Sequence, residues 1–168
     1  MKLEGSCRCG AVRFSVEAQS PAPYMHCYCS ICRKSAGGGG YAINLGAWAE
    51  TLTVEGRDHI AEWRAPLDDP KHEGRTKQGS SRRSFCRHCG SALWAFDPQW
   101  PELLHPFASA IDTPLPTPPE RVHIMLAYKA PWVTVPSGPQ DRHFDHYPDE
   151  SLESWHRRHG LYDEPVKA

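Results

Sequence analysis

The sequence predicts a single, mainly β domain with few short helices, and three observations support this fold class. Several segments have the alternating or β-branched and aromatic composition of strands. Only the region around residues 27–36 and the C-terminal tail look helical. At 168 residues the chain is long enough for one real core and too short for two comfortable domains.

The first strand is predicted at residues 11–17, where apolar and polar residues alternate. Val12, Phe14 and Val16 would lie on one face and the residues between them on the other, as in a half-buried strand. Further strand-like runs occupy residues 50–56, 59–65, 91–96, 105–112 and 121–128.

The segments between these strands are predicted from their turn-forming residues. Residues 64–83 are polar and rich in turn formers, which indicates a long loop; an ordinary solvated insertion is favoured over a lid. Residues 113–119 contain four prolines and predict an extended connector. In the tail, Pro148 and Asp149 can start a helix that presents Leu152 and Trp155 and ends at Gly160.

Charge and hydropathy exclude several classes of function. The formal net charge is -1, from 19 basic and 20 acidic side chains, and like charges do not cluster, so nucleic acid is not an expected partner. No apolar run approaches the roughly 20 residues of a membrane span, and the first residues lack the apolar core of a signal peptide. We therefore expect a cytoplasmic protein whose seven cysteines are reduced and serve as metal ligands or reactive thiols.

Two of the three cysteine groups are doublets, Cys7 with Cys9 and Cys86 with Cys89. Together they supply the four thiolates of a tetrahedral structural zinc site. The alternative is that these thiols pack as small hydrophobic groups, but their polar neighbours Arg8, Arg87 and His88 suit a zinc knuckle better.

The remaining group, Cys27, Cys29 and Cys32, offers one thiolate too few for a closed site. Three protein ligands and an open fourth position are typical of a zinc ion that takes part in chemistry. Two alternatives stay open: a histidine such as His88 or His123 could close the site, or the three thiols could form a metal-free redox group.

The order of these motifs, CxC, then CxCxxC followed by Arg-Lys and glycine, then FCxxCGSxL, resembles the glutathione-dependent formaldehyde-activating family, also called the centromere protein V domain family. The similarity extends over roughly residues 2 to 135 and includes the run VHIMLAYKAPWV. It implies a β-tent fold of paired antiparallel sheets. It also implies a structural zinc at Cys7, Cys9, Cys86 and Cys89 and a functional zinc at Cys27, Cys29 and Cys32.

The resemblance further implies a reaction, the joining of glutathione to formaldehyde as S-hydroxymethylglutathione, which makes the protein a carbon-sulfur lyase in the reverse direction. Glutathione would then be the co-substrate of a protein with two zinc ions per chain. The alternative is a zinc-stabilised, non-catalytic protein-binding module. In either case we expect residues 1–135 to form the zinc-binding domain and residues 136–168 a C-terminal extension with a short helix.

Overall fold

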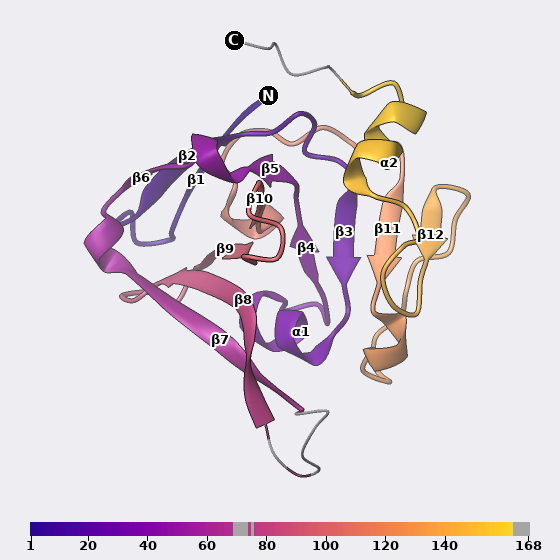
Figure 1. The fold of residues 1–168 in the computed structure, drawn as a ribbon, viewed down its shortest axis with the longest axis horizontal. Coiled ribbons are helices and arrows are strands. Elements are labelled where there is room, and N and C mark those ends of the chain that lie inside the picture. The colour runs from indigo at the N-terminus through magenta and orange to yellow at the C-terminus, as the bar shows by residue number, and fades with distance from the viewer. Residues whose placement is uncertain (69–73, 75, 163–168) are drawn as a thin grey trace.

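The computed structural model describes residues 1–68, 74 and 76–162, and within these residues the chain is mainly β, with three sheets and two short α-helices (Figure 1). This confirms the predicted fold class. None of the described helices is long and apolar enough to cross a membrane.

The N-terminal sheet consists of β1 (Lys2–Ser6), β2 (Arg13–Glu17) and β6 (Thr53–Glu55), which pair antiparallel in the order β1-β2-β6. Phe14 and Val16 are buried while Arg13 and Glu17 are exposed, which confirms the predicted strand and its faces. Phe14 packs edge-on against Trp94 of the second sheet, with 5.1 Å between the ring centroids. The two sheets therefore share one apolar core.

The second sheet has five antiparallel strands in the order β5-β10-β9-β8-β7. These strands are β5 (Ala47–Trp48), β7 (Ile60–Asp68), β8 (Thr76–Cys86), β9 (Ala92–Phe96) and β10 (Leu103–Pro106). The tight connection between β8 and β9 contains the second cysteine doublet.

The third sheet, in the order β12-β11-β3-β4, joins distant parts of the chain. In it β11 (Arg121–Ile124) runs parallel both to β3 (Tyr24–Cys27) and to β12 (Asp141–His143), whereas β4 (Ala42–Asn44) is antiparallel to β3. Figure 1 shows β3, β11 and β12 side by side. Because β3 is paired on both sides, its carboxyl end at Cys27 is held in place.

Short helical segments connect the strands. The α-helices are α1 (Ser30–Ala36) and α2 (Leu152–Arg158), and the 3₁₀ turns are η1 (Ala49–Thr51), η2 (Arg57–His59), η3 (Ala108–Ala110) and η4 (Leu126–Tyr128). The strands predicted at residues 105–112 and 121–128 are thus shorter than expected and end in η3 and η4. Between β11 and η4, Met125 has a φ of 61°, a left-handed conformation that does not continue a strand.

The prediction of a long loop at residues 64–83 was wrong. Strand β7 continues to Asp68, strand β8 begins at Thr76, and the two pair in register from Pro66 opposite Gln78 onward. This end of the hairpin is largely exposed, so its strands do not need the apolar alternation on which the prediction depended. Pro66 is tolerated because β7 is an edge strand and the register shifts between Arg64 and Pro66. The lid hypothesis concerns residues 69–73 and 75, which lie outside the described part of the chain.

The C-terminal extension packs against the rest of the protein through α2. The helix begins after Ser151, whose hydroxyl accepts a hydrogen bond from the Ser154 N–H, so it starts later than Pro148 and Asp149 would place it. Trp155 is buried in the main core, and its Nε1–H donates to the Glu120 carboxylate at 3.0 Å. The extension is therefore part of the same hydrophobic core as the sheets.

Glu120 is a buried carboxylate that ties the extension to β11. It pairs with Arg142 at 2.9 Å and with Arg158 at 3.1 Å. Burial alone would raise the pKa of Glu120, but hydrogen bonds from Arg158, Trp155 and His159 lower it to about 2.

The Glu120→Gln substitution should destabilise the protein at neutral pH by about 2 kcal/mol, because it removes the buried carboxylate that accepts from Trp155 and pairs with the half-exposed Arg142 and Arg158. The folded-state pKa of Glu120 is depressed, so its contribution is complete above the ordinary value of 4.5 and is lost as the pH falls towards 2. Denaturant unfolding across this range, followed by tryptophan fluorescence, should show a shallower loss of stability in the variant. Glu153→Gln, which breaks an exposed pair with Arg157, is the control. Equal pH slopes for wild type and Glu120→Gln would contradict the assignment.

Candidate functional site

The first candidate site is a cluster of four thiols brought together by two turns. Cys7 and Cys9 follow β1, Cys86 is the last residue of β8, and Cys89 lies in the turn between β8 and β9. Their sulfur atoms all lie within 4.8 Å of one another, with 3.5 Å between Cys7 and Cys9 and 3.7 Å between Cys9 and Cys86.

The backbone explains why these thiols converge. Gly10 and Gly90, one in each turn, have φ values of 77° and 73°, which residues with a side chain rarely adopt. Each turn is closed by a backbone hydrogen bond, from Gly10 N–H to the Cys7 carbonyl and from Gly90 N–H to the Cys86 carbonyl.

The geometry of the four thiols fits a zinc ion. Tetrahedral zinc with Zn–S bonds of about 2.3 Å requires sulfur atoms about 3.8 Å apart, close to the separations that the cluster already has. All four sulfur atoms could coordinate a single tetrahedral ion. This cluster can therefore hold a metal ion, and it would leave no ligand position free.

The second candidate site is the cluster of Cys27, Cys29 and Cys32, whose sulfur atoms also lie within 4.8 Å of one another. Cys27 is the last residue of β3, Cys29 is the N-cap of α1, and Cys32 lies on the first turn of that helix. The Cys32 N–H donates to the Cys29 sulfur at 3.3 Å. The predicted helical region around residues 27–36 is thus confirmed, and its cap is the thiol of Cys29.

The three thiols differ in acidity. Hydrogen bonds from the Cys27 and Cys32 thiols, together with the Cys32 backbone N–H, lower the pKa of Cys29 to about 2. The pKa of Cys27, in contrast, is raised by its hydrogen bonds with Cys29 and Cys32 and further by burial. Cys29, which is also the least buried of the three, is therefore the thiol that most readily becomes a thiolate.

In the described part of the chain, no histidine or carboxylate lies close enough to all three thiols to complete the cluster. His123 is occupied on both ring nitrogens, by the Tyr28 hydroxyl and by Asp141. His88 hydrogen-bonds to His59 beside the four-thiol cluster. The structure thus favours an open fourth position over a histidine-closed site.

Arg83 is a residue of this site that the sequence analysis missed. Its Nη2 lies 3.8 Å from the Cys32 sulfur, and its Nε is buried without a hydrogen-bond partner among the described residues. Three thiolates on a divalent ion would carry a net negative charge, which the guanidinium can offset. The three-thiol cluster therefore also fits a zinc ion. Arg83 was hidden within the segment assigned to a loop; recognition of strand β8 would have placed it.

A chain of hydrogen bonds supports the backbone between Cys27 and Cys29. The buried Tyr28 hydroxyl contacts His123 Nδ1 at 2.9 Å, and His123 Nε2 contacts Asp141 at 3.0 Å. The hydrogen bond from His123 lowers the pKa of Asp141, and Arg121 contributes to the same effect. Because Asp141 is in β12, the extension helps to fix the thiol cluster.

Comparisons with known proteins show the family of this chain. The model of the family described as glutathione-dependent formaldehyde-activating enzyme matches residues 2–127. The chain belongs to this family. A curated relative from Halomonas elongata is 59% identical over 161 residues, which cover 96% of this chain and 98% of that protein; it is provisionally named a glutathione-dependent formaldehyde-activating enzyme.

A solved structure extends the likeness of this family member to the fold. The crystal structure of a Rhodobacter sphaeroides protein superposes with a TM-score of 0.51 at 27% identity, covering 69% of this chain and 92% of that one. Since the family model ends at residue 127, the family match does not include β12 and α2.

Purified protein should contain two zinc ions per chain, and a metal-binding dye should remove one of them first. The three-thiol site should release its ion more readily because one position is open to the chelator. Cys29→Ser should keep the fold and the ion of the four-thiol site. Cys86→Ser should lose that ion and, with it, much of the stability. Native mass spectrometry and circular dichroism measure these outcomes. Equal resistance of both ions to the dye would contradict an open site.

Replacement of Arg83 by Met should weaken metal binding at the three-thiol site by about 10-fold, because the positive charge beside Cys32 is lost. Arg82→Met is the matched control, since Arg82 is the exposed neighbour on the same strand. Competition with the dye measures both affinities. If the two variants bind metal equally well, Arg83 does not support the site.

Proposed function

We propose that the protein is a zinc-dependent enzyme that joins glutathione, or a similar thiol, to formaldehyde or another small aldehyde. It would act as an S-hydroxymethylglutathione synthase, a carbon-sulfur lyase in the reverse direction. The observation that carries this proposal is the three-thiol cluster, which has no fourth ligand among the residues that the structure describes. The family membership and the name of the Halomonas relative support the two substrates.

The reaction needs a thiol, an aldehyde and the transfer of one proton. The thiol sulfur forms a bond to the carbonyl carbon, the π electrons of the C=O bond move to the oxygen, and that oxygen takes the proton that the thiol gives up. A zinc ion held by Cys27, Cys29 and Cys32 would lower the pKa of an entering thiol and polarise the carbonyl group.

The protein's own residues would contribute orientation and charge. Strand β3 and helix α1 hold the three sulfur atoms in a fixed array, supported by the Tyr28 network. Arg83 lies against this array and would stabilise the negative charge that develops there. Holding thiol and aldehyde together also removes the entropic cost of their encounter.

The four-thiol cluster would have a structural role in this proposal, because it joins the turn after β1 to the turn after β8. We place the protein in the cytoplasm, where its seven thiols stay reduced. The domain division into residues 1–135 and 136–168 remains a proposal.

The proposed reaction can be tested by magnetisation-transfer NMR of the exchange between formaldehyde, glutathione and their adduct. Zinc-loaded protein should accelerate the exchange, and Cys29→Ser should return it to the buffer rate while retaining the fold. Ser30→Ala, at the exposed neighbouring position, is the matched control and should keep the wild-type rate. A wild-type rate equal to that of buffer would contradict the formaldehyde reaction.

A further inference from the structure

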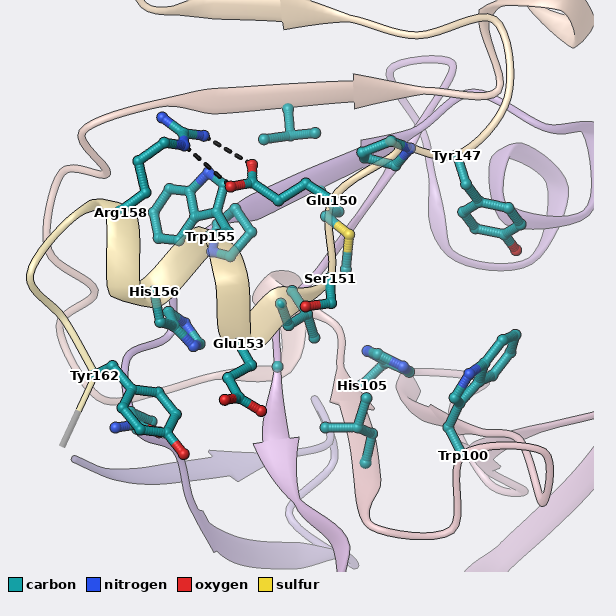
Figure 2. A pocket seen from close by; sticks show the side chains of 18 of the residues that line it. Trp100, His105, Tyr147, Glu150, Ser151, Glu153, Trp155, His156, Arg158 and Tyr162 are labelled. Carbon is teal, nitrogen blue, oxygen red and sulfur yellow. Dashed lines mark hydrogen bonds and ion pairs between the residues drawn. The ribbon is translucent and has the colours of Figure 1, made fainter. Parts of the chain in front are cut away.

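A cavity with a volume of about 520 Å³ lies under helix α2. Figure 2 shows α2 along one side and Trp100 and His105 on the other. Leu152 of α2 faces Gly46, since its Cδ1 would lie 3.4 Å from a Cβ atom added there. The volume is in the range of small-molecule sites, and formaldehyde would fill little of it.

The cavity borders the apolar cluster that contains two of the three thiols. Met25 lines the cavity and lies two residues before Cys27 on β3, so both side chains are on the same face of the sheet, about 7 Å apart along the strand. Met25 and Phe144, both of which line the cavity, also pack against the apolar cluster that contains Cys27 and Cys32. Met25 and Phe144 thus form an apolar wall between the cavity and the thiol cluster, so the side of the cavity nearest the thiols is apolar.

The walls of the cavity suit an uncharged, apolar molecule. Six of the lining residues are tryptophan, phenylalanine or tyrosine, among them Trp48, Trp100, Phe144 and Trp155. The two arginines on its wall, Arg142 and Arg158, are both held in ion pairs with Glu120, and Arg158 also pairs with Glu150, as Figure 2 shows. Among the described lining residues, no arginine or lysine is left unpaired to bind a carboxylate. The cavity therefore does not suit glutathione, a peptide that carries carboxylates.

His105 provides one hydrogen-bond acceptor in this apolar wall. Its Nδ1 lies 3.1 Å from the Leu45 carbonyl oxygen, which can only accept, so Nδ1 carries the proton. Burial lowers the pKa of His105, so the ring is neutral and Nε2 is an acceptor. A hydroxyl group on the ring of a bound molecule would find an acceptor there, whereas an aldehyde carbonyl, which can itself only accept, would not.

We propose that this cavity binds the carbon skeleton of an uncharged aldehyde about the size of a six-membered ring and directs its carbonyl carbon towards the three-thiol site. This inference rests on the proposed function and specifies that the aldehyde substrate is larger than formaldehyde. The chemistry is unchanged: the thiol sulfur bonds to the carbonyl carbon, and the thiol proton passes to the carbonyl oxygen. The cavity supplies affinity for the aldehyde by burying its apolar surface.

Binding can be tested separately from turnover with benzyl alcohol, which has the ring and a hydroxyl group but no aldehyde. Wild-type protein should bind it, as measured by calorimetry and by the fluorescence of the cavity tryptophans. Leu152→Trp should fill the cavity and weaken this binding at least 10-fold. The matched control is Ser154→Trp, at an exposed position of α2 outside the cavity lining, and it should bind like wild type.

Turnover is compared as kcat/KM for benzaldehyde relative to formaldehyde with the same thiol. This ratio should fall at least 10-fold in Leu152→Trp and stay unchanged in Ser154→Trp. Absence of saturable benzyl alcohol binding, or equal binding by Leu152→Trp, overturns the cavity as a site. Binding without any benzaldehyde turnover, in protein that accelerates the formaldehyde reaction, overturns the aldehyde assignment. Protein that binds the alcohol and accelerates neither reaction overturns the proposed function itself.

Discussion

The pairing of β3 with β11 is the interaction on which the rest of the structure depends. It places His26 beside His123 and Cys27 beside Ile124, and it extends through β11 to β12. The end of β3 carries Cys27 and leads into the helix that holds the other two thiols, and Met25 of the same strand lines the cavity. If β3 moved relative to β11, the thiols, the cavity wall and the contacts of the extension would all be displaced.

The two thiol clusters follow from different kinds of local structure. The four-thiol cluster depends on two tight turns, each with a glycine in a left-handed conformation, and joins segments far apart in the chain. The three-thiol cluster is local, built where a strand passes into a helix whose cap is itself a thiol. A cluster made of turns can surround an ion, whereas a cluster at one strand end reaches it from one side only.

The sequence predicts the parts of this structure that depend on local patterns. Alternation identified β2, and cysteine spacing identified the two groups that the fold brings together. The sequence does not show that β8 begins as early as Thr76. The hairpin of β7 and β8 is held there by backbone pairing, and its exposed side chains show no pattern. Arg83 was missed for the same reason. The cavity depends on how α2 lies beside the second and third sheets, which no local pattern encodes.

The sequence separation of β3 and β11 has a consequence for synthesis of the chain. Cys27 emerges from the ribosome roughly a hundred residues before β11 and β12, which complete its sheet. At about 5–20 residues per second, translation leaves this interval open for about 5 to 20 seconds. Throughout that time the three neighbouring thiols lie on an unfinished sheet, accessible to oxidants and to any metal in the surroundings. A nascent chain of this protein thus depends on a reducing environment before it has a folded structure to protect it.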